Sequence, residues 1–408
     1  MNPQPHASGR APSIAVVGSG PSGCYTALAL SKKLPGSAIV VFDASPTPYG
    51  LLRSGIAADH QGMKGAARQF DRMFASGKAT FVGGVRIGDR IGLDDLTAAF
   101  DAVVVATGLA GDRPLAVPGG DLDGVYGAGD VVRLLNGHAD AALRHQSRLR
   151  HRGLGTDVLV VGTGNVAVDV VRLLTKSDLE LHGSDIDDDA RSLLRADDIR
   201  SIRILGRGPA DKAKWDPAMF RELADVAAIR MRVDGQAVAE VEGSRRVDVD
   251  VHFEASPTLV HAAGDDYDVT VRTSHGTQTH RVGAVITATG FVERDDIPWA
   301  TIPTADLHRV YRAGGCDTGV LGNLGENRTS AGAVAATIAA TIEIDDHRRA
   351  DPLAALRDRL PADAVSYEDW QHIDAEEVRR APAERCRWKF TDSAELYRAL
   401  AHAERPAT

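Results

Sequence analysis

Two glycine-rich segments carry the clearest chemical signal, because both have the spacing of nucleotide-binding loops. The second segment, GTGNVA, places Gly162, Gly164 and Ala167 in the GxGxxA pattern. In such loops the first glycine permits a tight turn, the second lets the backbone approach a pyrophosphate, and the third position packs a helix on a strand. Unpaired N–H groups at the start of the following helix attract the phosphates. The first segment, GSGPSG, consists of Gly18, Ser19, Gly20, Pro21, Ser22 and Gly23.

The residues around the first loop predict a complete β-strand–helix–β-strand unit. The apolar run SIAVV, residues 13–17, precedes the loop, and CYTALALSKKL follows it with helical spacing. A second apolar run, AIVVFD, ends in Asp43, 20 residues after Gly23. A carboxylate at this distance accepts hydrogen bonds from a ribose diol. Strand, helix, second strand and acid together predict a dinucleotide site; the alternative is a glycine-rich turn without a ligand.

The second loop lies in a similar unit, which ends differently. DVLVV, residues 157–161, precedes the loop and VDVVRLL continues it as a helix; residues 175–198 resemble an acidic insertion. The next predicted strand, residues 202–206, is followed by Arg207 instead of an acid. An acid there would repel a 2′-phosphate, whereas an arginine can pair with it. The pattern favours NADP over NAD, although Arg207 is equally compatible with an ordinary surface arginine.

A repeated strand indicates how the two units are connected. DAVVVATG (101–108) and GAVITATG (283–290) are near-copies, each a buried strand ending in ATG. We therefore expect an α/β fold with two Rossmann-like dinucleotide-binding domains, one inserted into the other. The outer domain comprises residues 1–108 and 290–408, and the inserted domain residues 109–289. Alternating residues in RVDVDVHFEA and YDVTVRT, within residues 232–281, predict antiparallel strands or hairpins.

A third glycine cluster, within residues 313–338, follows the predicted strand VYRAG and leads into an apolar helix. Backbone N–H groups at such a helix start can stabilise negative charge on a reduced ring; a flexible connector is the alternative. Two dinucleotide sites in one chain suggest a redox relay from a nicotinamide to a flavin. Hydride transfer between stacked rings requires no general base, so the sequence need not contain a catalytic triad or a metal site.

Composition excludes several other classes of protein. The chain has 408 residues, a formal net charge of −9 and 43% hydrophobic residues, and nothing in this balance favours nucleic-acid binding. Cys24, Cys316 and Cys386 lie far apart without a CxxC motif, which excludes a dithiol redox site and a cysteine zinc ribbon. Few cysteines suit a reducing cytoplasm. No apolar run approaches the roughly 20 residues that a membrane span needs, and the polar N-terminus lacks the features of a signal peptide.

At the level of whole segments, the chain resembles the adrenodoxin-reductase type of ferredoxin–NADP reductase, including its bacterial members. The resemblance runs from Ser13 to about Phe390. The long segment PYGLLRSGIAADHQGMK is its most specific part. The other segments that carry the resemblance are GSGPSG, GDRPL, GTGNVAVDVVRLL, GRGP, FRELADV, the glycine-rich stretch from Ala313, and YEDWQHIDAEEV.

The resemblance implies FAD on the first loop, NADPH on the second, and electrons leaving singly to an acidic ferredoxin-type iron–sulfur protein that serves a cytochrome P450 or another oxygenase. It places His60 and Glu222 at the nicotinamide, in a positioning or proton-balancing role; a polar core histidine is the alternative. The nicotinamide would stack on the flavin near Gly315. The implied FAD contacts are Gly18 to Gly23, Asp43, Leu51, Gly322, Asn323 and Leu324. The implied NADPH contacts are Arg113, Gly164, Asn165, Val166, Ala167, Val168 and Arg207.

The departures from the family pattern bear on specificity. Gly315 stands where the family has a tryptophan, which would open space beside the flavin. Gly206 replaces the first of two arginines, so half of the expected 2′-phosphate clamp is missing and NADH becomes possible. Met219 replaces an expected glutamate. The basic stretch VRRAPAERCRWK, residues 378–389, either steers an acidic electron carrier or is a solvated surface.

Three functions therefore stay open at the level of sequence. The first is reduction of a ferredoxin by NADPH through FAD. The second is a flavoenzyme of the same fold that acts directly on a small organic substrate admitted beside Gly315. The third, from another class, is a non-catalytic FAD- and NAD(P)-binding sensor or assembly subunit.

Overall fold

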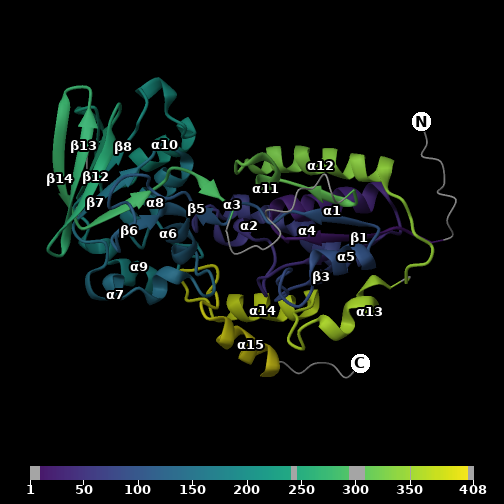
Figure 1. Ribbon diagram of the computed structural model, residues 1–408. Helices are drawn as coiled ribbons and strands as arrows, with labels where there is room; N and C mark the ends of the chain where they lie inside the picture. Colours follow the sequence, from purple (N-terminus) through teal and green to yellow (C-terminus); the bar gives the residue numbers. More distant parts are fainter. Residues whose placement is uncertain (1–9, 240–245, 294–307, 350, 403–408) are drawn as a thin grey trace.

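The computed structural model describes residues 10–239, 246–293, 308–349 and 351–402, and these form two α/β units (Figure 1). The first unit is built on a five-stranded parallel sheet in the order β17-β4-β1-β2-β3. Strand β17 comes from the C-terminal part of the chain, after the whole second unit. The strands are β1 (Ser13–Val17), β2 (Ala38–Phe42), β3 (Thr80–Val82), β4 (Ala102–Val105) and β17 (Val310–Arg312).

The second unit is built on a seven-stranded sheet in the order β10-β9-β11-β8-β7-β15-β6, and a three-stranded antiparallel sheet, β12-β13-β14, accompanies it. The strands of the larger sheet are β6 (Val125–Gly127), β7 (Asp157–Val161), β8 (Ser201–Leu205), β9 (Ile229–Val233), β10 (Gln236–Ala239), β11 (Val247–His252) and β15 (Ala284–Thr287). Those of the smaller sheet are β12 (Ser256–Ala263), β13 (Asp266–Thr273) and β14 (Gly276–Val282).

One short ribbon joins the two units. The chain enters the second unit through β5 (Gly111–Asp112) and leaves it through β16 (Phe291–Val292), and these two strands pair antiparallel. The second unit is therefore inserted into the first, and the expected α/β fold with two dinucleotide-binding units is confirmed.

The prediction of antiparallel strands within residues 232–281 is correct for YDVTVRT, which forms most of β13, and wrong for RVDVDVHFEA. The latter contains β11, which pairs in parallel with both β8 and β9. Its residues alternate because Val247, Val249 and Val251 enter the core while Asp248 and Asp250 stay half-buried on the other face. Asp248 and Asp250 pair with Arg230 and Arg232 of the neighbouring strand β9. Alternation thus reflects a parallel strand with one polar face.

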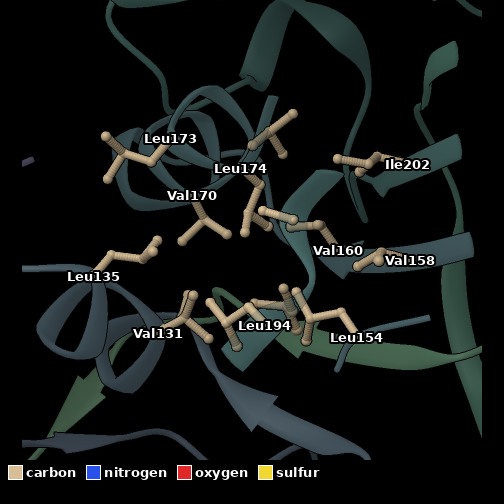
Figure 2. Close-up of a cluster of buried hydrophobic side chains, with 14 of the residues drawn as sticks. Val131, Leu135, Leu154, Val158, Val160, Val170, Leu173, Leu174, Leu194 and Ile202 are labelled. Carbon is tan, nitrogen blue, oxygen red and sulfur yellow. The ribbon is translucent and has the colours of Figure 1, made fainter. Parts of the chain in front are cut away.

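Each glycine loop leads into a helix that packs on its own sheet. In the first unit α1 (Pro21–Lys33) packs against α12 (Leu324–Thr341), which approaches closely through its buried Ala331 and Ala335. In the second unit α8 (Asn165–Thr175) supplies much of the core shown in Figure 2, together with side chains of β7, α6 and α9. The labelled members of that core are Val131, Leu135, Leu154, Val158, Val160, Val170, Leu173, Leu174, Leu194 and Ile202.

The remaining helices cover the sheets and connect the units (Figure 1). They are α2 (Leu51–Ser54), α3 (Gln61–Lys64), α4 (Arg68–Ala75), α5 (Leu93–Ala99), α6 (Ala128–Leu135), α7 (Ser147–Arg152), α9 (Asp188–Leu194), α10 (Pro217–Ala224), α11 (Gly315–Thr318), α13 (Pro352–Leu356), α14 (Tyr367–Arg379) and α15 (Ser393–His402). Among the helices of the described ranges, none has both the length and the apolar character that a membrane crossing requires.

The basic stretch at residues 378–389 is divided, with Arg379 and Arg380 exposed and two other cations buried. Arg385 is 8% exposed and pairs with Asp188 of the second unit. Lys389 is 5% exposed and pairs with Asp185. These cations are buried where the C-terminal segment meets the second unit, so the prediction that they steer an acidic carrier is wrong for Arg385 and Lys389.

Candidate functional site

The two glycine loops have the same local architecture. Gly18 has φ +105°, and a Cβ there would lie 2.5 Å from the Ala106 carbonyl oxygen. Gly162 has φ +128°, and its Cβ would lie 2.3 Å from the Ala288 carbonyl oxygen. Ala106 and Ala288 are the alanines of the two ATG repeats, and each donates its N–H to the last residue of the strand before the loop. The alanine of each ATG repeat therefore packs directly against the first glycine of the neighbouring loop, and leaves no room for a side chain there.

The second glycine of each loop faces open space. A Cβ on Gly20 or Gly164 would have no atom within 4 Å. In contrast, a Cβ on Gly23 would lie 1.9 Å from the Gly18 carbonyl oxygen, because α1 packs tightly on β1 there. An open second glycine at a helix start is what a pyrophosphate requires. Both loops fit a dinucleotide on this geometry.

A cavity of about 720 Å³ lies at the carboxyl edge of the first sheet. The predicted residues that line it are Gly18, Gly20, Pro21, Ser22, Asp43, Leu51, Gly315, Gly322, Asn323 and Leu324. Ser19 and Gly23 do not line the cavity; Ser19 is buried behind it and Gly23 packs under α1. The cavity brings the first loop and the third glycine cluster together, although some 300 residues separate them.

Asp43 is held at the cavity wall by the first loop. Its Oδ2 accepts hydrogen bonds from the Ser19 N–H at 2.7 Å and from the Ser19 hydroxyl at 2.6 Å, and its Oδ1 accepts from the Ser45 N–H at 2.8 Å. Burial raises the pKa of Asp43, and the hydrogen bonds from Ser19 and Ser45 oppose this rise. These hydrogen bonds fix the carboxylate at the wall of the cavity.

The third glycine cluster forms the opposite wall, where Gly315 lines the cavity with leucine side chains next to it. Gly315 is buried in α11, and a Cβ there would lie 3.2 Å from Leu109 and 3.3 Å from Leu321 side-chain carbons. These two leucines occupy the space next to the glycine. At the start of α12, Asn323 caps the helix by accepting the Glu326 N–H at 2.9 Å, and Asn327 donates to the Gly322 carbonyl at 2.9 Å.

The predicted contacts of the second site gather at the carboxyl edge of the second sheet. Asn165 begins α8 and its side chain accepts the Asp216 N–H at 2.6 Å, so it fixes a neighbouring segment. Arg113 donates its backbone N–H to Gly290 of the second ATG at 2.9 Å and leaves its guanidinium exposed. Arg207 follows β8 and is exposed. Val166 is half-buried, while Ala167 and Val168 are fully buried in α8 and support the loop.

His60 and Glu222 lie in contact across the two units. His60 precedes α3 of the first unit, and its Nε2 is 3.0 Å from the Glu222 Oε2 on α10 of the second. The other Glu222 oxygen accepts hydrogen bonds from Arg172 at 2.9 Å and Lys176 at 3.4 Å. The predicted pair is thus joined, although neither residue is among those lining the large cavity.

A network of charges surrounds this pair. Asp59 binds both Arg172 and Lys176, and Asp169 binds Arg172 at 2.7 Å. Partial burial would raise the pKa of Glu222, but Arg172, His60 and Lys176 together hold it below its usual value. Asp59, His60 and Glu222 could offer three ligand atoms to a metal ion. Because two cations already neutralise both carboxylates, the group fits an ion-pair network better than a cation site.

Several residues of these sites escaped the sequence analysis. Thr107 and Gly108 line the large cavity, and the ATG repeat is the signal that could have found them. Leu321 and Asn327 complete the third glycine cluster. Arg172 lies in the last turn of α8 and Lys176 directly follows the helix, but nothing in their spacing shows that they meet Asp59 of the other unit.

The comparisons with known proteins agree with this geometry. The family model described as pyridine nucleotide-disulphide oxidoreductase matches residues 12–306. The chain belongs to this family. In the absence of a CxxC motif, its membership rests on the two nucleotide-binding units and not on a redox-active disulphide.

Among curated relatives, this pyridine nucleotide-disulphide oxidoreductase is similar to the cindoxin reductase of Citrobacter braakii. The two are 38% identical over 94% of this chain and 90% of the relative. The probable ferredoxin/ferredoxin–NADP reductase of Mycobacterium bovis is 32% identical over 96% of this chain and 76% of its own length.

Solved structures of FprA, an oxidoreductase of Mycobacterium tuberculosis, superimpose over 96% of this chain and 100% of FprA. One has a TM-score of 0.82 at 27% identity. Another, the complex of FprA with NADPH, has a TM-score of 0.81 at 27% identity. The expected resemblance to ferredoxin–NADP reductases is confirmed.

Proposed function

We propose that this chain is a ferredoxin–NADP reductase-type flavoenzyme. It binds FAD at the first glycine loop and NADPH at the second, and it supplies single electrons to a ferredoxin-type iron–sulfur protein. When bound, FAD accepts a hydride from NADPH and releases the electrons one at a time. The names of the relatives support an iron–sulfur partner, which would in turn serve a cytochrome P450 or another oxygenase.

The observation that carries the proposal is the twin architecture of the loops. Gly18 over Ala106 and Gly162 over Ala288 repeat the same close packing, and Gly20 and Gly164 are both open. One chain therefore offers two pyrophosphate cradles, one of which opens into a cavity of about 720 Å³. Two such cradles in one chain support hydride transfer between two dinucleotides.

We assign the flavin-binding domain to residues 1–108 and 290–408, and the NADPH-binding domain to residues 109–289. The cavity walls would hold the flavin, with Asp43 at its ribose and the start of α12 at its ring system. Backbone N–H groups of the open loop at Gly164 would hold the pyrophosphate of NADPH. Arg113, which follows β5 at the ribbon between the units, would contact NADPH with its exposed guanidinium.

His60 and Glu222 act as a positioning pair in this proposal. Their contact joins α3 of the first unit to α10 of the second, so it holds the two cofactor sites in one orientation. Glu222 stays ionised because Arg172 and Lys176 bind it, and it can hold a proton on His60 Nε2. The pair therefore offers a proton-balancing group next to the interface that both nucleotides share.

The test is anaerobic stopped-flow reduction of the purified protein. We expect a yellow protein whose flavin absorbance bleaches on mixing with NADPH, and faster cytochrome c reduction when a bacterial ferredoxin is added. A protein that takes up no flavin would contradict the proposal at its first step.

The same experiment separates the other candidate functions. Flavin that binds but is reduced by neither NADPH nor NADH would indicate a sensor or assembly subunit. Oxidation of NADPH that depends on a small organic substrate without ferredoxin would indicate direct catalysis, which Leu109 and Leu321 beside Gly315 disfavour. We place the enzyme in a reducing compartment such as the cytoplasm, since all three cysteines are free.

A further inference from the structure

The segment that follows β8, residues 210–216, lies directly on the second glycine loop. The Lys214 N–H donates to the Thr163 carbonyl at 2.9 Å, and Lys214 and Gly164 form a bridge of the parallel type. The Asp216 N–H donates to Asn165 Oδ1 at 2.6 Å. The backbone of Lys214 is therefore fixed beside Gly164, whose open face is where a pyrophosphate would bind.

Aromatic packing holds this segment in place. Trp215 stacks on Phe220 with ring centroids 4.4 Å apart and meets Phe253 edge-on at 5.7 Å. The Asp216 side chain caps α10 by accepting the Ala218 N–H at 2.7 Å. Because Trp215 points into the domain, the neighbouring Lys214 side chain is exposed to solvent.

Two exposed cations on segments next to the second glycine loop have no carboxylate partner among the described residues. Within residues 10–239, 246–293, 308–349 and 351–402, neither Arg207 nor Lys214 forms an ion pair with an acidic side chain, although both are exposed. Lys212, between them, pairs with Asp211 at 3.9 Å. Lys214 is bonded to Thr163 through its backbone, and Arg207 follows Gly206, which also lies against Thr163. Two free cations on neighbouring segments are an electrostatic feature that an anion can complete.

Position 206 cannot supply a second cation itself. A Cβ on Gly206 would lie 2.9 Å from Phe253 and 2.9 Å from Thr163 side-chain carbons, so a longer side chain there would have to displace Phe253 or Thr163. Any charge that complements Arg207 has to come from another segment. Lys214 is fixed to Thr163 of the glycine loop, the residue that also lies against Gly206.

We propose that Lys214 is a specificity-determining residue, which together with Arg207 binds the 2′-phosphate of NADPH and so selects it over NADH. This inference rests on the proposed function, because it concerns the same nucleotide site. A 2′-phosphate carries up to two negative charges, which one arginine alone does not neutralise. An acid at the end of β8 would select NAD instead, and the sequence has Gly206 and Arg207 there.

The test uses the FAD-loaded enzyme and two adenine nucleotides that differ only in the 2′-phosphate. Dissociation constants for 2′,5′-ADP and 5′-AMP are measured by calorimetry for the wild type, Lys214→Met and Arg207→Met. The control is Lys78→Met, an exposed lysine in the first unit. We expect the wild type to prefer 2′,5′-ADP, Lys214→Met to reduce that preference about tenfold, and Lys78→Met to retain it.

A second readout is the dependence of 2′,5′-ADP binding on salt, which should weaken in Lys214→Met because one fewer cation contacts the phosphate. An unchanged preference in Lys214→Met, with Arg207→Met impaired, would overturn the inference and leave the proposed function intact. Failure of the wild type to be reduced by either NADPH or NADH would instead overturn the proposed function.

Discussion

Gly162 and Gly164 stand two residues apart in one loop, yet a methyl group meets opposite surroundings at each. In Gly162→Ala the methyl would lie 2.3 Å from the Ala288 carbonyl oxygen at φ +128°. We expect this variant to lose about 3 kcal/mol of stability through steric overlap and backbone strain. In Gly164→Ala the methyl meets no atom of the protein, so the variant should fold within about 0.5 kcal/mol of the wild type.

Gly164→Ala should have little effect on stability but a large effect on NADPH binding. Its methyl occupies the face that a pyrophosphate approaches, so NADPH should bind at least about tenfold more weakly while FAD stays bound. Thermal unfolding and stopped-flow titration with NADPH check both halves of the prediction. Normal NADPH affinity in a fully stable Gly164→Ala variant would show that the pyrophosphate does not bind at this loop.

The role of a single residue can be predicted from the sequence where it depends on the spacing of residues in one short segment. The roles of Gly18, Gly20 and Asp43 follow from a short strand, turn and helix, and the structure places these residues together at one cavity. The contact between His60 and Glu222 could not be derived in this way. Residues 162 positions apart meet only because the second unit folds back on the first.

Among the elements, the ribbon of β5 and β16 deserves a direct test because it also anchors a helix. Asp112 of β5 accepts the N–H groups of Gly129 at 2.8 Å and Asp130 at 2.9 Å, at the start of α6. We expect Asp112→Ala to lower stability by about 1 kcal/mol, as the loss of a helix cap does. Asp121→Ala, in an exposed turn, is the matched control.

Thermal unfolding measures the stability of both variants. The rate of flavin reduction by NADPH shows whether the orientation of the units has changed. If Asp112→Ala unfolded at the same temperature as Asp121→Ala and the wild type, the capping role would be refuted. A decrease in the reduction rate of Asp112→Ala alone would show that the ribbon also orients the two sites.

The strands show why the pairing of β11 could not be predicted from the alternation of its polar and apolar residues. Buried runs such as SIAVV and DVLVV predict parallel strands because both of their faces are covered. Strand β11 is parallel too, but only its valine face is covered, so its pattern equals that of an antiparallel strand. Which neighbour a strand pairs with depends on the whole sheet. The alternation of polar and apolar residues in one segment therefore cannot predict whether the pairing is parallel or antiparallel.

On the scale of the whole molecule, a buried charge cluster ties three parts of the chain together. Lys64 of the first unit and Lys389 of the C-terminal segment share the carboxylate of Asp185 in the second unit, at 2.7 and 2.8 Å. Lys389 also donates to the backbone carbonyls of Arg53 at 3.1 Å and Asn136 at 2.9 Å. Lys389 therefore contacts both units at once, and its ionisation is coupled to their docking.

The pH dependence of stability tests this coupling. Burial lowers the pKa of Lys389 to about 7, although Asp185 opposes the shift. An unfolded chain keeps this lysine protonated up to about pH 10.4. Between these values the unfolded state binds one more proton than the folded state, so the stability contributed by this site rises with pH, by up to about 1.4 kcal/mol per unit.

Substitution of Lys389 by methionine removes the titrating group and should remove this slope. We expect the wild type to gain stability relative to Lys389→Met as the pH rises from 7 to 9, by about 2 kcal/mol in total. Melting temperatures are compared at matched pH values, so that the other titrating groups cancel in the difference. Lys78→Met, which alters an exposed lysine, should follow the wild type at every pH. Parallel curves for the wild type and Lys389→Met would mean that the lysine keeps its proton in the folded protein, and that the docking of the units does not respond to pH through this cluster.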